Sequence, residues 1–348
     1  MAERRDTRLR FEQWARNPAC TANTISAVHG VPMADVVKQE GGAQTMGQSP
    51  FALARGQTFE RALFRDNAGV LREALKTAQV LPETATGFRD FRLRQSGGPF
   101  RTLDEALTDT LTFLKENAAA RPGRELPGVV AGAVVRIPGG VMLPEAILVI
   151  DVLAVTRAHD RPLLTVGEIK TYPDRGGYTD GAELATARAQ AGVYVHGLRL
   201  VLEELRLAER IEVPNVGFLV LSRPGFNRPS IRAREDLRYQ VTRAARGFAQ
   251  LRDVAATLPF ETDPLAVIDA ILRASVDYGE LCVSFCDRAA GCHKRALADG
   301  DATALGEDVA RFLGTTNLYR ALELLGGARP ANEAEEDLVR RMAAVRRN

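Results

Sequence analysis

The spacing of apolar residues follows two patterns along the chain. Apolar positions three to four residues apart predict amphipathic helices, and short runs rich in β-branched residues predict strands. The predicted helices cover 8–30 (interrupted at Asn17 and Pro18), 51–78, 102–120, 180–206, 235–257, 264–274, 302–313 and 317–325. The predicted strands cover 129–137, 146–155, 163–169, 211–222 and 230–234. Glycine- and proline-rich breaks are predicted at 121–123 and 138–140, connections at 31–50 and 82–101, and a charged tail from Glu333.

The order of these elements indicates the fold class. Helices come first, then three strands, a helix, two more strands and a final set of helices. A hairpin followed by a helical crossover to further strands is typical of an α/β protein, with a mixed central sheet flanked by helices. We predict an N-terminal helical part, a strand-rich core, a cysteine-containing segment and a C-terminal part with helices and a charged tail, at 1–125, 126–260, 261–300 and 301–348.

Charged residues interrupt the two apolar runs between 145 and 170, which flank a polar turn and predict a β-hairpin. Asp151 lies inside the first run, and Glu168 and Lys170 end the second. Because Glu168 and Lys170 are two residues apart, both side chains point to the same face of a strand. Charges on a buried strand need a partner or a metal ion, since an unpaired buried charge is unfavourable.

Two carboxylates and a lysine are groups that metal-assisted phosphodiester hydrolysis uses. Carboxylate oxygens bind Mg²⁺ or Mn²⁺, and a neighbouring lysine orients the attacking water and offsets developing negative charge. The alternative is a solvated charge pair on an exposed strand, where Glu-x-Lys sequences are common. Only five of the 46 basic residues are lysines, which favours a specific role for Lys170.

Two predicted helices carry polar pairs at one-turn spacing. Gln190 and Tyr194 are four residues apart, as are Gly56 and Glu60, so each pair shares a helix face. Glutamine and tyrosine can hydrogen-bond a phosphate or a base, and tyrosine can stack on a base. For Gln190 and Tyr194 the alternative is an amphipathic helix with a tyrosine at the edge of the core.

The four cysteines are unevenly placed. Cys20 lies near the N-terminus, whereas Cys282, Cys286 and Cys292 fall within eleven residues. Structural disulfides are not expected in a cytoplasmic chain, so the cysteines predict metal ligation. Both a zinc ion, with Cys20 or His293 as fourth ligand, and an iron–sulfur cluster agree with this spacing.

The hydropathy of the chain and its net charge bear on its cellular location and its partners. No apolar run approaches the roughly 18 residues that a membrane span needs, and no apolar segment typical of a secretory signal follows the N-terminus. We therefore expect a cytoplasmic protein with no membrane association. The formal net charge of +2 neither requires nor excludes nucleic acid as a partner.

Taken together, the motifs resemble one nuclease family. The RecB-like family of PD-(D/E)xK nucleases has the same order of motifs, which here read Gly56-Gln-Thr-Phe-Glu60, Asp151, Glu168-Ile169-Lys170 and Gln190-x-x-x-Tyr194. One cysteine before this core and three after it resemble the iron–sulfur branch of the family. That branch includes the AddB nuclease domain and the CRISPR-associated RecB-like exonucleases. The resemblance covers about residues 8 to 300.

The resemblance implies a restriction-endonuclease-like fold and a [4Fe–4S] cluster. The cluster would join the N- and C-terminal segments through Cys20, Cys282, Cys286 and Cys292. The chain departs from the family pattern in the gap of three residues between Cys282 and Cys286, where two are usual. It also has Glu60 where the family often has histidine.

The resemblance also implies roles for the residues of the core. Asp151, Glu168 and Lys170 would be catalytic, and the Mg²⁺ or Mn²⁺ ligands would be Glu60, Asp151, Glu168 and the carbonyl of Ile169. Lys170 would position the attacking water. Gln190 and Tyr194 would contact DNA, and arginines would line its path, namely Arg188, Arg232 and Arg234.

The implied function is that of a metal-dependent deoxyribonuclease. It would be an exonuclease acting on DNA ends or single strands, in DNA repair or antiviral defence, with a helicase or another nucleic-acid-processing subunit as partner. The sequence has no nucleotide-binding motor motif of its own. The alternatives are a non-catalytic nucleic-acid-binding or scaffold subunit with the same fold, and a zinc-stabilised protein of unrelated function.

Overall fold

The computed structural model of the chain describes residues 7–42, 50–92, 101–120, 126–137, 147–224, 228–258, 261, 263–278 and 282–345. The predicted breaks at 121–123 and 138–140 lie outside the described residues, as does Glu145. The chain forms two compact units, one of Met1–Leu9 with Gln48–Asp253 and one of Arg10–Gly47 with Val254–Asn348. The boundary predicted at residue 125 therefore falls inside the first unit.

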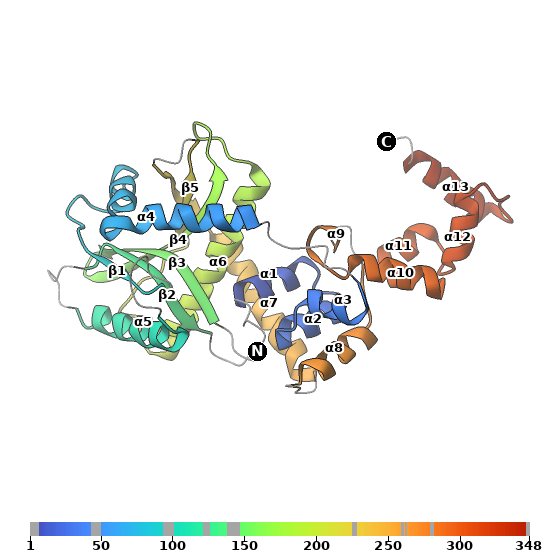
Figure 1. The fold of residues 1–348 in the computed structure, drawn as a ribbon, viewed down its shortest axis with the longest axis horizontal. Coiled ribbons are helices and arrows are strands. Elements are labelled where there is room, and N and C mark those ends of the chain that lie inside the picture. Colours follow the sequence, from blue (N-terminus) through green and yellow to red (C-terminus); the bar gives the residue numbers. More distant parts are fainter. Residues whose placement is uncertain are drawn as a thin grey trace. The chain divides into compact units, whose positions relative to one another are not determined.

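The first unit contains a six-stranded sheet (Figure 1) whose strands lie in chain order. The strands are β1 (Phe88–Asp90), β2 (Val129–Arg136), β3 (Ile147–Ala158), β4 (Arg161–Pro173), β5 (Val216–Ser222) and β6 (Ser230–Asp236). Strands β2, β3 and β4 pair antiparallel, as do β5 and β6, whereas β1–β2 and β4–β5 are parallel. The predicted mixed sheet in an α/β protein is confirmed. Strand β1 was predicted as part of a connection, because three half-buried residues have no readable alternation.

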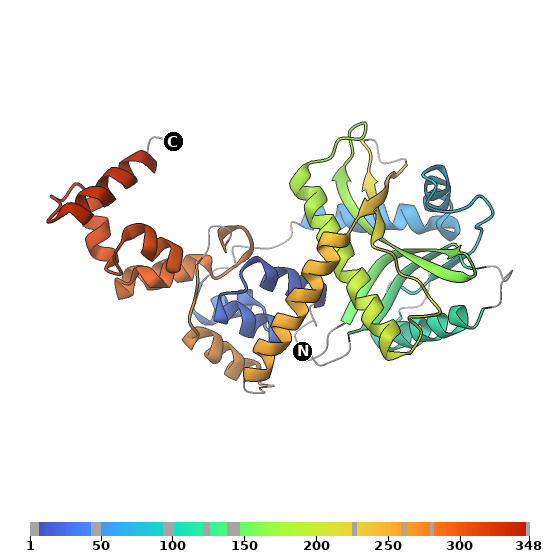
Figure 2. The ribbon, with the colours of Figure 1, turned by 180° about the vertical axis from the view of Figure 1, so that it is seen from behind.

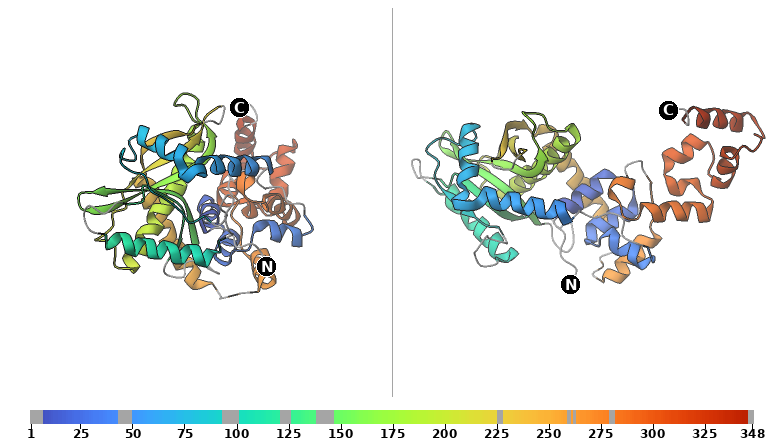
Figure 3. Two further views of the ribbon diagram at one scale, coloured as in Figure 1. Left: turned by 60° about the vertical axis from the view of Figure 1, so that its left-hand side comes forward. Right: turned by 45° about the horizontal axis from the view of Figure 1, so that its top comes forward.

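Helices cover both faces of this sheet. They are α4 (Pro50–Thr77), α5 (Leu103–Ala118), α6 (Gly181–Glu204) and most of α7 (Arg238–Thr257). Val220 of β5 belongs to the apolar cluster that includes α4, whereas its neighbours Leu219 and Leu221 pack against α6. Because successive strand residues point to opposite faces, α4 and α6 lie on opposite sides (Figures 1 and 2). Figure 3 shows α4 on one side of the sheet and α5 on the other.

Helix α4 is not one straight helix as predicted. Asp66, Asn67 and Ala68 have φ values of 51°, 55° and 57°, and the helix axis breaks there. Aspartate and asparagine are the non-glycine residues that adopt this left-handed region most readily. The buried side chain of Ala68 packs in the same apolar cluster as Leu71 and Leu75, so the break lets both halves of α4 contribute to one core.

The second unit is helical. It contains most of α1 (Thr7–Arg16), α2 (Thr21–His29), α3 (Met33–Gln39), α8 (Pro264–Arg273), α9 (Cys282–Phe285), α10 (Ala289–Asp299), α11 (Glu307–Leu313), α12 (Leu318–Leu325), α13 (Glu333–Val345) and a 3₁₀ turn (Ala302–Leu305). Its first core joins distant parts of the sequence, because Met33 and Val36 of α3 pack with Val267 and Ile271 of α8.

Two predictions for this unit were wrong. The stretch 31–50 contains α3, and the charged tail forms α13. In α13 the charges lie on the surface, while Leu338 and Met342, one turn apart, are buried against Leu324 of α12. Packing against another element stabilises these short or highly charged helices, and single-sequence patterns do not report it.

Gly167 on β4 is a position where a side chain does not fit. An added Cβ would overlap the Phe218 ring and lie 2.7 Å from Val152. Gly167→Ala is therefore expected to lower the free energy of unfolding by about 1–3 kcal/mol, measured by urea denaturation. Gly181→Ala, where an added Cβ meets nothing within 4 Å, is the matched control. Equal stability of the two variants would contradict this packing.

Candidate active site and cysteine cavity

Asp151 and Glu168 come together through the register of β3 and β4. Val152 pairs with Gly167, so Asp151 and Glu168 are the next opposed positions and point to the same face. Oδ2 of Asp151 accepts the backbone N–H of Ile169 at 3.0 Å. This bond fixes the carboxylate of β3 beside the strand that carries the other carboxylate.

Glu168 and Lys170 form an ion pair, with 2.7 Å between Oε1 and Nζ. Glu168 is completely buried, whereas 18% of the Lys170 side chain is exposed. A carboxylate removed from water needs such a partner, and removing the partner leaves an uncompensated charge. The alternative of a solvated charge pair therefore does not describe Glu168.

Helix α6 supplies a third contact to this group. The hydroxyl of Tyr194 donates to Oδ1 of Asp151 at 3.4 Å. Tyr194 is fully buried and Gln190, one turn earlier, is 5% exposed. Because a ring without exposed surface cannot stack on a base, the stacking predicted for Tyr194 does not fit this structure. The tyrosine instead holds the Asp151 carboxylate.

Glu60 lies on a helix and not on the two strands that carry Asp151 and Glu168. It is exposed on α4, directly after Phe59, which packs in one apolar cluster with Ile169. Ile169 and Glu168 are neighbours on β4 and point to opposite faces. Glu60 is therefore carried by the helix that covers the face opposite to Glu168, and its metal role stays a prediction.

Asp151 and Glu168 suit a magnesium or manganese ion. Mg²⁺ typically takes one or two protein carboxylates and completes its shell with waters and substrate phosphates. Across the described parts of the chain, no group of three or more His, Cys, Asp or Glu residues is placed to hold a metal ion. The hard carboxylate oxygens of Asp151 and Glu168 are the donor type that such an ion prefers, so these residues fit the metal implied by the sequence.

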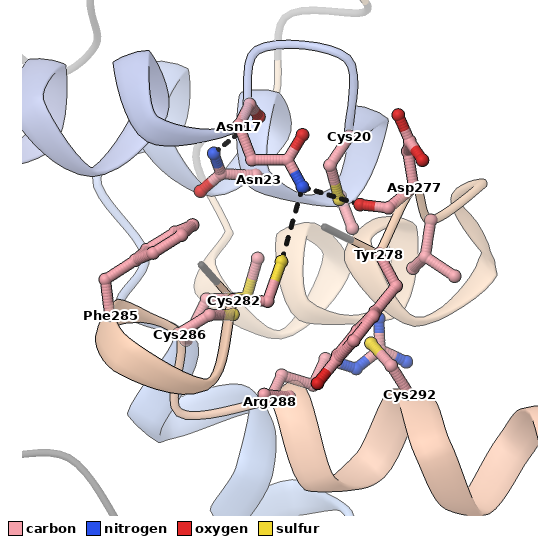
Figure 4. Close-up of a pocket in the computed structure, with 14 residues that line it drawn as sticks. Asn17, Cys20, Asn23, Asp277, Tyr278, Cys282, Phe285, Cys286, Arg288 and Cys292 are labelled. Carbon is pink, nitrogen blue, oxygen red and sulfur yellow. Dashed lines mark hydrogen bonds between the residues drawn. The ribbon is translucent and has the colours of Figure 1, made fainter. Parts of the chain in front are cut away.

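The four cysteines line a single cavity in the second unit. Cys20 is the N-cap of α2, Cys282 begins α9, Cys286 follows that helix, and Cys292 lies in α10. Figure 4 shows them around the cavity. Residues separated by more than 260 positions in the sequence therefore meet at one place.

Two polar side chains that the sequence analysis did not assign accompany the cysteines. Asn17 donates from Nδ2 to Sγ of Cys282 at 3.4 Å. Arg288, 4% exposed, lines the cavity and forms an ion pair of 3.0 Å with Glu40. Asn17 was predicted only as a helix break. Its position three residues before Cys20 is the sequence feature that could have indicated a place near the cysteines.

Burial controls the protonation of two of the thiols. It raises the pKa of Cys286 to about 12 and that of Cys292 to about 11. Reactive nucleophilic cysteines have lowered pKa values, the opposite direction to the shift of these two thiols. Thiolate ligands must lose their protons on binding metal, and four thiols around one cavity are a suitable donor set for a cluster.

His293 takes another position. Its ring lies against the ring of Tyr278, with the centroids 4.5 Å apart. The described residues that line the cavity do not include it. The predicted zinc site with His293 as a ligand is therefore less consistent with the structure than ligation by the four cysteines.

The arginines expected along the DNA path differ in their pairing. Arg188 and Arg232 both bind the buried carboxylate of Glu235, at 2.5 and 3.0 Å. Arg234 is exposed. Arg188 and Arg232 thus share one carboxylate, which balances one of their two positive charges.

Comparison with known proteins adds no family to this description. Neither the scan against protein-family models nor the search among curated proteins finds a match. Within the described residues, no helix has the length and apolar character needed to cross a membrane.

Proposed function

We propose that this chain is a metal-dependent deoxyribonuclease of the RecB-like PD-(D/E)xK type, with a restriction-endonuclease-like core. The observation that carries the proposal is the buried Glu168–Lys170 ion pair beside Asp151, 2.7 Å long and on one face of two paired strands. Burying a carboxylate raises the free energy of the folded chain unless the charge is paired or binds a metal ion. Here it has a lysine partner and a second carboxylate next to it.

Each residue has a distinct task in this proposal. Asp151, Glu168 and the Ile169 carbonyl would hold Mg²⁺ or Mn²⁺, which when bound polarises the scissile phosphate and lowers the pKa of water. Tyr194 and the Ile169 N–H keep Asp151 in place. Lys170 orients the attacking water and offsets the negative charge that develops on the phosphate.

We further propose that Cys20, Cys282, Cys286 and Cys292 bind a [4Fe–4S] cluster in the second unit. Their side chains line one cavity. Four sulfurs spread around a cavity are what a cluster needs, because each thiolate binds a different iron. Cytoplasmic action in DNA repair or antiviral defence, beside a helicase or another nucleic-acid-processing subunit, belongs to the same proposal.

Cleavage of labelled DNA tests the nuclease activity. The purified chain is incubated with single-stranded and duplex oligonucleotides in Mg²⁺, in Mn²⁺ and in EDTA, and the products are separated by length. We expect cleavage in either metal and none in EDTA. DNA that is bound but stays intact with both metals would favour the non-catalytic alternative.

Tyr194→Phe tests whether this tyrosine positions Asp151 or contacts DNA. The ring stays in the core and only the hydroxyl is lost, so we expect the cleavage rate to fall about tenfold while DNA affinity is unchanged. Tyr239→Phe, at a 68% exposed position, is the control. A loss of DNA affinity with an unchanged rate would instead indicate direct contact with DNA.

A further inference from the structure

An arginine-rich surface lies in the first unit where β4 and β5 end. Arg175 and Arg223 border an open pocket, and Arg223 and Arg228 border a second one. The two pockets share Arg223 and Ile231 and are therefore adjacent. Three guanidinium groups thus line one continuous stretch of surface.

The charges of these three arginines are not compensated within the described structure. Arg175, Arg223 and Arg228 are exposed, and none forms an ion pair with a described residue. Arg232, which lines the first pocket, differs because it forms an ion pair with Glu235. Exposed arginines with no acidic partner attract anions, and several along one surface suit a chain of phosphates.

A short turn adds an aromatic ring to this surface. Arg175 and Tyr178 exchange backbone hydrogen bonds of 2.9 and 3.4 Å. Gly176 and Gly177 between them have φ values of +67° and +94°. The turn is anchored because Oδ1 of Asp174 accepts the Gly177 N–H at 3.0 Å. It presents Tyr178, 70% exposed, on the same turn as Arg175.

We propose that Arg175, Tyr178, Arg223 and Arg228 bind single-stranded nucleic acid, the arginines through phosphates and the tyrosine by stacking on a base. Exposed aromatic rings among basic residues favour single strands, because stacking needs an unpaired base. The surface begins where β4 ends at Pro173, three residues beyond Lys170, or about 10 Å of extended strand. The further idea that this surface leads a nucleic-acid strand to Lys170 rests on the proposed nuclease function.

The test measures binding without cleavage. Fluorescence anisotropy of a labelled oligodeoxythymidylate of about 20 nucleotides is followed in EDTA at several salt concentrations. For the triple variant Arg175→Ala, Arg223→Ala, Arg228→Ala we expect at least tenfold weaker binding. The slope of log K against log salt should fall by about 2, or ~0.7 per lost phosphate contact.

Tyr178 separates stacking from charge. Tyr178→Ala is expected to weaken binding of the same oligonucleotide roughly tenfold, with an unchanged salt slope, whereas Tyr178→Trp should keep the affinity. Binding of a duplex of equal length should not depend on Tyr178. Equal losses for single strand and duplex would overturn the single-strand assignment.

A second triple variant controls for net charge. Arg206, Arg210 and Arg246 are also exposed and also lack an ion pair with a described residue, and two of them precede β5 at its opposite end. Replacing these three with alanine should leave affinity and slope near those of the unmodified chain. The same loss as in the first triple variant would overturn the proposal. Since EDTA prevents cleavage, a chain that binds in this pattern but never cleaves would refute only the nuclease function.

Discussion

Replacing Lys170 with alanine is expected to abolish metal-dependent DNA cleavage, with a rate loss of at least ~10²-fold. DNA binding should change little, because the arginine-rich surface stays intact. The variant should also be less stable without metal. Its buried Glu168 loses the 2.7 Å partner, and breaking a buried pair typically costs about 3 kcal/mol.

Added metal gives this prediction a readout that does not depend on activity. A divalent ion bound between Asp151 and Glu168 would compensate the charge that Lys170 no longer balances. Mn²⁺ should therefore raise the melting temperature of Lys170→Ala more than that of the unmodified chain. In Lys170→Ala with Glu168→Gln, stability should be partly regained but cleavage should not.

Lys38→Ala provides the matched lysine control, since 63% of that side chain is exposed in a surface ion pair. It should leave both cleavage and stability unchanged. If Lys170→Ala cleaves as fast as Lys38→Ala, the lysine has no catalytic part. The non-catalytic scaffold would then be the better description.

The carboxylate–lysine site was accessible from sequence because its parts are local. Asp151 and Glu168 lie on one hairpin, so a single register places them opposite each other. The two-residue spacing of Glu168 and Lys170 fixes their common face. Burial could not be predicted from the sequence, and it distinguishes a solvated charge pair from a fully buried carboxylate paired with a lysine.

The role of α6 depended on tertiary packing. A glutamine and a tyrosine one turn apart share a face whether that face meets DNA or the sheet. The structure places Tyr194 in the core with its hydroxyl toward Asp151, 43 residues earlier in the chain. Likewise, the pairing of Arg188 with Glu235 joins positions 47 residues apart, and no local pattern reports such a contact.

The helical second unit was predicted least well for a related reason. Helices α3 and α13 are short or highly charged, and each is held by a few apolar residues against a distant partner. The sequence did show the uneven spacing of the cysteines. Their common cavity required the N-terminal helices to pack against α8, which the apolar pattern alone does not specify.

Loss of one cluster ligand is the second large expected effect. Anaerobically purified protein should be brown and hold about four iron atoms per chain. Cys20→Ser, Cys282→Ser, Cys286→Ser and Cys292→Ser should each lose most of the iron and the visible absorption. Each variant should also lower the melting temperature of the second unit by about 10 °C, because the cluster would link Cys20 to the segment of the other three cysteines and so close a very long loop, worth roughly 3 kcal/mol or more.

His293→Ala separates cluster from zinc. Its ring lies against Tyr278, so the variant should keep its iron, its colour and its melting temperature within a few degrees. Colourless protein with one zinc per chain, lost on replacing His293, would overturn the cluster assignment. The nuclease proposal would survive that result, because Asp151, Glu168 and Lys170 lie in the other unit and do not depend on the cysteines.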